Sequence, residues 1–257
     1  MPASLKLARE FGDDLALVMV ESQGSNMEEQ EAFVWKRKWM GTQAMWTTER
    51  PFDTGAGGLP NFALLSAEGE VLLMGNPSSM HGKIEDAIAE EIAKAKKVPA
   101  DTPKAFKKAW KEFVKGNYAK AVAEARKVEA KGGEDGEIAA GAVEDFVDAI
   151  ENKYARVGWL MDNGYFGKAQ SMFKDLSKQT KGLADIAEAH AELAQRFEAP
   201  ELKAELDAAK AFERIESKLQ ENGFDEKLVK KLESFAKKNA ESKVVSRAEH
   251  ILKLAKS

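Results

Sequence analysis

The pattern of hydrophobic and polar positions changes near residue 80. Before this point, short apolar runs alternate with turn residues, which is typical of buried strands. Beyond it, apolar residues recur at helical spacing with polar residues between them. One such stripe consists of Ala105, Phe106, Ala109, Trp110 and Phe113. The sequence therefore predicts a mixed α/β part followed by an all-helical part.

The first part is predicted to contain an opening helix tail, four strands and one further helix between the first two strands. The helix begins near Met27, where Glu28 and Glu29 form an acidic first turn. The last two strands are joined by an Ala-Glu-Gly turn at 67–69, and this turn chemistry predicts a β-hairpin. The predicted elements are a strand at 14–21, a helix at 27–40, strands at 43–48, 61–66 and 70–75, and a Gly/Pro-rich loop at 50–60.

The second part is predicted to be helical almost throughout. It is rich in Ala, Glu and Lys and contains few β-branched residues, a composition that favours helix. Glycine and proline mark most of the expected helix boundaries. The predicted helices are 83–97, 104–115, 117–130, 135–162, 165–179, 182–196, 200–221, 225–239 and 241–255.

A short motif occurs twice in the helical part. The stretch 116–121 reads Gly-x-aromatic-x-x-Ala, and 164–169 reads the same. In arrays of helical hairpins the glycine permits a tight turn, the aromatic ring fills the hairpin, and the alanine lets the helices approach. The motif resembles the turn of tetratricopeptide repeats, although their period of about 34 residues is shorter than the spacing here. A tetratricopeptide-like array is expected, and ordinary helix–turn–helix joints remain the alternative.

The composition excludes several kinds of chemistry. The chain has 257 residues and no cysteine, which excludes disulfides, cysteine-ligated zinc, iron–sulfur clusters and a cysteine nucleophile. The three histidines, His81, His190 and His250, are far apart in sequence. No phosphate-binding, dinucleotide-binding or hydrolase motif is present. We therefore assign no catalytic residue, no metal ligand and no cofactor.

The charges are nearly balanced, with 39 basic against 43 acidic side chains. A nucleic-acid partner is not expected, because such proteins carry a basic patch or stripe. No apolar run approaches the roughly 18 residues of a membrane-spanning helix. The opening residues show neither the apolar region nor the cleavage site of a signal peptide.

The region around Pro60 resembles a known family. Residues 57–65 combine small residues, Leu59-Pro60 and an apolar strand, and a short acidic turn and a second strand follow at 66–71. This order resembles the cis-proline loop and β-hairpin of thioredoxin-like proteins. The opening stretch 1–13 is similar to the helix segment that follows the redox dithiol in the TlpA-type branch of thiol–disulfide oxidoreductases.

The resemblance implies a fold and a binding site. The implied fold is an incomplete α/β thioredoxin-like domain at 1–82, joined through a linker at 98–103 to an all-α helical-hairpin array within a second domain at 83–257. The bond between Leu59 and Pro60 is implied to be cis, which leaves the Leu59 main chain free to pair with an extended peptide. Leu59 and Pro60 are therefore the expected substrate- or peptide-binding residues.

The resemblance also implies where the redox site of the family lies. Its first strand and dithiol would precede Met1, so this chain is expected to be redox-inactive. A Cys-x-x-Cys upstream would make the whole protein an oxidoreductase, and the TlpA-type branch would then imply a periplasmic location. The expected partner is a protein or peptide, and an unpaired sheet edge makes a homodimer a further expectation. The alternative function is a non-catalytic scaffold that binds proteins through the helical array.

Overall fold

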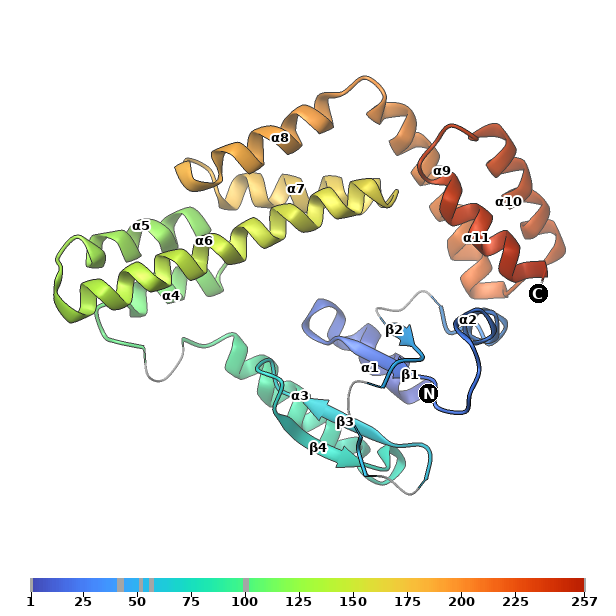
Figure 1. Cartoon of the computed structure of the whole chain (residues 1–257), viewed down its shortest axis with the longest axis horizontal. Helices are drawn as coiled ribbons and strands as arrows, with labels where there is room; N and C mark the ends of the chain where they lie inside the picture. The colour runs from blue at the N-terminus through green and yellow to red at the C-terminus, as the bar shows by residue number, and fades with distance from the viewer. Residues whose placement is uncertain (1, 41–43, 51–52, 56–57, 99–101, 257) are drawn as a thin grey trace. The chain divides into compact units, whose positions relative to one another are not determined.

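The computed structural model describes residues 2–40, 44–50, 53–55, 58–98 and 102–256 (Figure 1). Within these ranges the chain is mostly helical, with two small sheets of two strands each. The chain forms two compact units. The first unit comprises Met1–Lys96, Ile215–Lys231 and His250–Ser257, and the second comprises Lys97–Arg214 and Leu232–Glu249.

The expected domain boundary after residue 82 stays a prediction, because a compact set of contacts does not by itself delimit an independently folding domain. Residues 99–101 of the expected linker and Gly57 of the family motif lie outside the described residues. None of the described helices is long and apolar enough to cross a membrane.

The first unit contains the strands and helices that the hydrophobic pattern predicts. A helix over the opening residues is followed by strand, helix, strand, hairpin and helix. The elements are α1 (Pro2–Phe11), β1 (Leu17–Val20), α2 (Met27–Lys36), β2 (Ala44–Thr47), β3 (Phe62–Leu65), β4 (Val71–Gly75) and α3 (His81–Ala95), with 3₁₀ turns at Gly12–Asp14 and Pro77–Ser79.

Local side-chain chemistry sets the start of α2. The Asn26 side chain accepts the Glu29 amide at 3.0 Å, and the Glu29 carboxylate accepts the Asn26 amide at 3.0 Å, which forms a capping box. The helix ends at Lys36, earlier than predicted. Lys38 has a φ of 58°, a left-handed conformation that cannot continue an α-helix.

The strands form two separate pairs. Strands β1 and β2 are parallel, with Leu17 opposite Ala44. Strands β3 and β4 are antiparallel, with Phe62 opposite Gly75 and an irregularity in register between Leu64 and Leu65. No described strand connects the two pairs into one sheet.

Helices α1 and α3 share the core of the first unit. Leu7 of α1 is buried together with Ile84 and Ile88 of α3. Partly buried side chains from the hairpin, from the approach to β1 and from α1 and the region of α3 pack against this cluster. They are Phe11, Leu15, Phe62, Leu64, Leu73, Met80 and Ile92.

Segments from the end of the chain complete the first unit. Phe224 stacks on the buried Trp35 ring of α2, with ring centroids 5.6 Å apart. His250 Nε2 lies 2.8 Å from a carboxylate oxygen of Glu31. A second contact nearby joins Lys253 to Glu28 at 2.6 Å. The late helices thus contribute to the packing of α2.

The helical part agrees with its prediction element by element. Small shifts occur at the ends, and the predicted helix at 182–196 begins as a 3₁₀ turn at Ala184–Ile186. The helices are α4 (Lys107–Val114), α5 (Tyr118–Glu129), α6 (Gly133–Asp162), α7 (Phe166–Gln179), α8 (Ala187–Glu198), α9 (Leu202–Asn222), α10 (Glu226–Lys238) and α11 (Val245–Lys256).

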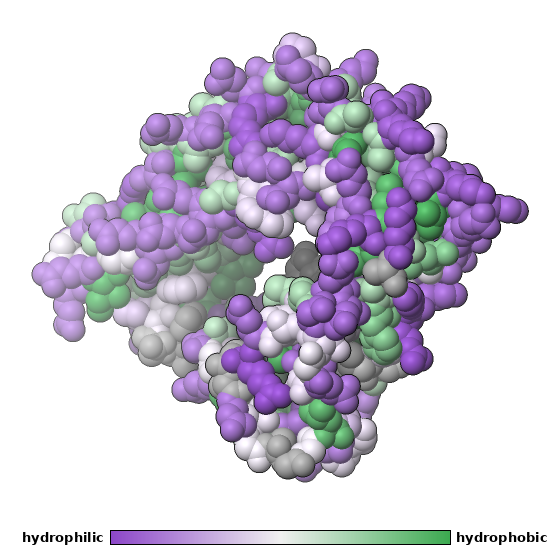
Figure 2. Space-filling model, turned by 45° about the vertical axis from the view of Figure 1, so that its right-hand side comes forward, coloured by the Kyte–Doolittle hydropathy of each residue, from purple (hydrophilic) through white to green (hydrophobic). Residues whose placement is uncertain are grey.

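The repeated motif lies at two helix–helix turns of the second unit. Gly116 connects α4 to α5 with a φ of 78°, and Gly164 connects α6 to α7 with a φ of 75°. Both motif alanines, Ala121 and Ala169, are fully buried. Glycine and alanine therefore occupy the positions that the motif predicts, while membership in a tetratricopeptide-like array stays a prediction. Polar side chains dominate the surface seen in Figure 2, with apolar atoms exposed in separate patches.

Candidate functional site

Leu59 and Pro60 lie just before β3, from which Asn61 separates them. The peptide bond between them is cis, which is the configuration that the family resemblance implies. Leu59 is 62% exposed and follows a glycine-rich loop. The residue is thus exposed near the start of the hairpin, and its role in peptide binding stays a prediction.

Polar contacts hold both sides of this position. Asn61 Nδ2 donates to Thr54 Oγ1 at 2.6 Å across the loop. Within the loop, the Gly55 amide donates to the Asp53 carboxylate at 2.9 Å. The contact between Asn61 and Thr54 was not predicted, although asparagine is a residue type that often forms side-chain hydrogen bonds in turns and loops.

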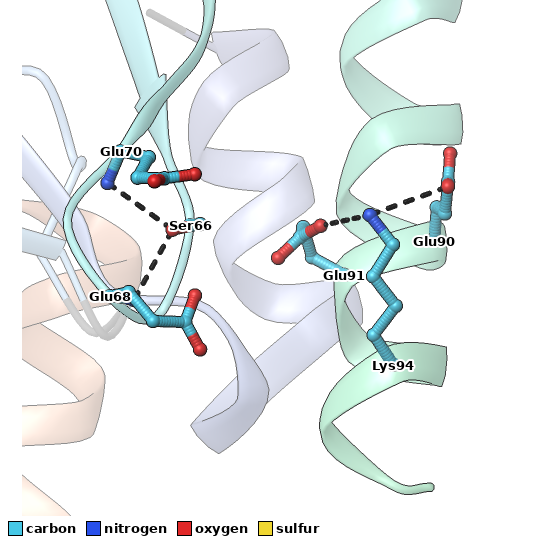
Figure 3. Close-up of polar contacts among 6 residues, drawn as sticks. All are labelled: Ser66, Glu68, Glu70, Glu90, Glu91 and Lys94. Atoms are coloured by element: carbon cyan, nitrogen blue, oxygen red, sulfur yellow. Dashed lines mark hydrogen bonds and ion pairs between the residues drawn. The ribbon is translucent and has the colours of Figure 1, made fainter. Parts of the chain in front are cut away.

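The far end of the hairpin is closed by a serine. Ser66 Oγ accepts the amides of Glu68 and Glu70, each at 3.2 Å (Figure 3). The Ser66 amide donates to the Glu70 carbonyl at 2.8 Å. These contacts fix the turn and therefore the register of β3, the strand that Leu59 precedes.

Charged residues on α3 form a small exposed network. Lys94 Nζ lies 2.7 Å from Glu91 and 3.4 Å from Glu90 (Figure 3). The hydrogen bond that Lys94 donates to the Glu91 carboxylate raises the pKa of Lys94 above its ordinary value. Because this lysine is fully charged at neutral pH and solvated, the network supplies neither a proton nor a nucleophile.

The Leu59 site offers main-chain hydrogen-bonding groups and an apolar side chain. These groups suit an extended polypeptide, which is recognised through its main chain. Thiol chemistry is excluded because the whole chain has no cysteine. Within the described residues, no group of three or more His, Asp or Glu side chains is placed to hold a metal ion.

A buried polar group in the second unit was not predicted. The Tyr154 hydroxyl lies 2.7 Å from Thr180 Oγ1. His190 is close by, with Nε2 at 3.2 Å from Ser177 Oγ and its ring 5.2 Å from that of Phe173. Burial of the Tyr154 hydroxyl raises its pKa. Helical spacing indicates only that these positions share faces of different helices, so the sequence carries no signal for their meeting.

Comparisons with known proteins found no match for this chain. The chain matches no family model, no curated protein and no solved structure.

Proposed function

We propose that the first unit is a thioredoxin-like, redox-inactive module that binds an extended protein segment at Leu59 and Pro60. The exposed Leu59, three residues before the start of β3, carries this proposal. A peptide laid beside this residue would gain main-chain hydrogen bonds and an apolar contact.

Two further observations support the proposal. The elements follow the order helix, strand, helix, strand, loop, hairpin and helix, which is the order that the resemblance implies. The buried cluster of Leu7, Ile84 and Ile88 joins the first helix of this order to the last. The absence of cysteine from the chain limits such a module to binding, because disulfide exchange requires a thiolate.

The binding test uses reduced and carboxymethylated insulin B chain, which stays extended and has no free thiol. We expect Leu59→Glu to weaken its binding about ten-fold, since a carboxylate replaces the apolar contact. Ile138→Glu is the matched control, because Ile138 is also an exposed aliphatic residue but lies on α6. Equal binding by both variants, or no binding by the wild type, would contradict the proposal.

The redox-inactive part has a separate assay. Incubation with insulin and dithiothreitol should give reduction at the background rate. Thiol-dependent turnover above that rate would exclude a purely binding role.

The alternative function is a scaffold that binds protein through the helical array. An exposed aromatic group in the second unit favours it: Trp159 is 57% exposed. Its ring stacks on Tyr165 at 5.9 Å, and the Arg247 guanidinium lies 3.9 Å from the Tyr165 ring centroid. Aromatic and arginine side chains grouped in this way are typical of the energetic centres of protein interfaces.

Affinity capture distinguishes the two functions. If the helical array is the binding surface, Trp159→Ser abolishes the capture of specific proteins while Leu59→Glu retains it. The opposite pattern supports the site at Leu59, and identical capture by both variants contradicts the scaffold function.

A further inference from the structure

Trp159 and Tyr165 form an exposed aromatic pair at the end of α6. Trp159 is 57% exposed. Its ring lies nearly parallel to that of Tyr165, with 14° between the ring planes and 5.9 Å between the centroids. Both residues belong to the second unit. The pair is therefore separate from Leu59 and from the strands of the first unit.

Contacts within the second unit hold the Tyr165 ring in place. The Arg247 guanidinium carbon lies 3.9 Å from the centroid of the Tyr165 ring and 4.7 Å from that of the buried Phe212. Its Nη1 also donates to the Gly164 carbonyl at 3.3 Å. A guanidinium that contacts two rings and a main-chain carbonyl fixes the ring on which Trp159 stacks. The pair is thus preorganised, which lowers the entropy lost when a partner binds.

The exposed surface of α6 around Trp159 carries little negative charge. Residues three, four or seven positions apart share a helix face. The exposed residues at these distances from Trp159 are Asn152, Ala155, Arg156, Asp162 and Asn163. Asp162 is the one acidic member of this set, and its carboxylate lies 2.6 Å from Arg196 and 3.8 Å from Lys243. Its charge is therefore already compensated.

Two cations lie next to the aromatic pair without an acidic partner. Arg156 precedes Trp159 by three residues on α6, and Lys168 Nζ lies 5.9 Å from the centroid of the Tyr165 ring. Both side chains are exposed, and neither forms an ion pair with any described residue. Arg156, Trp159, Tyr165 and Lys168 together form an aromatic and positively charged surface, which we call the Trp159 patch.

We propose that the Trp159 patch binds an acidic segment of a partner polypeptide. An apolar side chain of that segment packs on the Trp159 ring, and carboxylates on either side of it pair with Arg156 and Lys168. Tryptophan, tyrosine and arginine carry much of the binding energy at protein interfaces, and charge complementarity selects an acidic partner. The proposal rests on the scaffold function and names the chemistry of its partner.

The distribution of charge favours a polypeptide over a nucleic acid. Single-stranded nucleic acid also stacks on aromatic rings, but its phosphates require a groove of basic side chains along the strand. The chain has 43 acidic against 39 basic side chains. Asp162 follows Trp159 on α6, and a Cβ on Gly167 would lie 3.3 Å from a Glu213 carboxylate oxygen. A short acidic segment needs only the two cations beside the aromatic pair.

The first test uses the peptide Glu-Asp-Glu-Leu-Phe-Glu-Asp-Glu, acetylated and amidated so that its termini carry no charge. The NMR signal of the Trp159 indole N–H in the full chain, assigned through Trp159→Phe, reports binding at this residue. We expect this signal to shift with a Kd below about 1 mM. The uncharged control peptide Gln-Asn-Gln-Leu-Phe-Gln-Asn-Gln should bind at least about ten-fold more weakly. No shift at Trp159, or equal affinity for both peptides, would overturn the proposal.

Paired substitutions test the two cations. Arg156→Gln combined with Lys168→Gln removes two exposed charges, and we expect it to weaken binding of the acidic peptide about ten-fold. The matched control combines Lys131→Gln with Lys181→Gln, because both lysines are exposed in the same unit and their loss changes the net charge equally. Equal weakening by the two double variants would indicate attraction to the net charge alone and would contradict binding at the Trp159 patch.

Two further measurements separate the proposal from the alternatives. A single-stranded oligothymidylate of about 12 nucleotides should leave the Trp159 signal unchanged at about 0.15 M salt. Tighter binding of this oligonucleotide than of the acidic peptide would identify a nucleic acid as the partner and would overturn the proposal. Loss of affinity capture in Trp159→Ser without binding of the acidic peptide would overturn the acidic partner alone and leave the scaffold function standing.

Discussion

Tyr154 and Thr180 form a buried hydrogen bond between α6 and the end of α7. Their oxygens are 2.7 Å apart, and Thr180 Oγ1 also lies 2.8 Å from the Leu176 carbonyl oxygen. A carbonyl can only accept, so the threonine proton is directed to Leu176 and the tyrosine hydroxyl donates to Thr180. The hydrogen bonds therefore run from Tyr154 to Thr180 and from Thr180 to the Leu176 carbonyl, at the end of α7.

The direction of these two hydrogen bonds predicts that two substitutions lower the stability by different amounts. Thr180→Val leaves the buried Tyr154 hydroxyl without its partner, and we expect it to lower the free energy of unfolding by about 1–3 kcal/mol. Tyr154→Phe removes the donor and leaves the bond from Thr180 to Leu176, so we expect a loss of about 1 kcal/mol. Urea unfolding measures both. The double variant should lose less than the sum of the two, and strict additivity would contradict the contact.

The stability of the second unit should fall at alkaline pH because of Tyr154. Burial raises the pKa of this hydroxyl above its ordinary value of 10.0. The unfolded chain therefore loses this proton at a lower pH than the folded chain. The stabilising contribution is complete below about pH 10 and is lost as the pH rises above it. Above about pH 10, Tyr154→Phe should make the free energy of unfolding fall less steeply with pH than it does in the wild type. Tyr118→Phe is the control substitution.

Glu124 should titrate far below an ordinary glutamate. Lys127 Nζ lies 2.8 Å and Lys108 Nζ 2.9 Å from its carboxylate oxygens, and these contacts lower its pKa from 4.5 to about 2. The stabilising contribution is present above pH 4.5 and is lost as the pH falls toward about 2. Carbon-detected NMR titration of the carboxyl group measures the midpoint directly. Lys108→Met should raise that midpoint, and an unchanged value would show that the contact between α4 and α5 does not form in solution.

Gly164 should tolerate substitution less well than Gly182. Both have positive φ angles, 75° and 83°, but a Cβ on Gly164 would lie 3.3 Å from the Lys243 carbonyl oxygen, whereas one on Gly182 meets nothing within 4 Å. Gly182→Ala should therefore cost about 1 kcal/mol from backbone conformation alone. We expect Gly164→Ala to cost about 1–3 kcal/mol more, because backbone atoms must shift. Thermal unfolding of the two variants compares them, and equal losses would argue against close packing of the 164 turn on Lys243.

Local elements were predictable because their signals lie within a few residues. The stripe containing Phe106 and Ala109 predicts a buried helical face, and both side chains are buried in α4 and its approach. The hairpin follows from its Ala-Glu-Gly turn. The end of α2 was misplaced because the left-handed conformation of Lys38 has no marker such as glycine or proline.

Contacts between distant segments were not predictable from the same signals. Glu31 and His250 are 219 positions apart, and neither residue is distinctive within its own helix. The same holds for Tyr154 and Thr180, whose helices show only which of their faces are apolar. Leu59 and Pro60 were identified through a family resemblance, whereas the neighbouring hydrogen bond from Asn61 to Thr54 is seen only in the structure.

The sequence by itself determined the order and type of the elements, because periodicity and turn residues act over a few neighbouring positions. It also excluded thiol chemistry in this chain, because the composition contains no cysteine. The tertiary structure decided how the strands pair and which late residues pack on α2. The pattern of a strand specifies which side chains share a face, but it does not specify which neighbouring strand forms the main-chain hydrogen bonds with it. That choice depends on how the whole chain closes its loops around a common core.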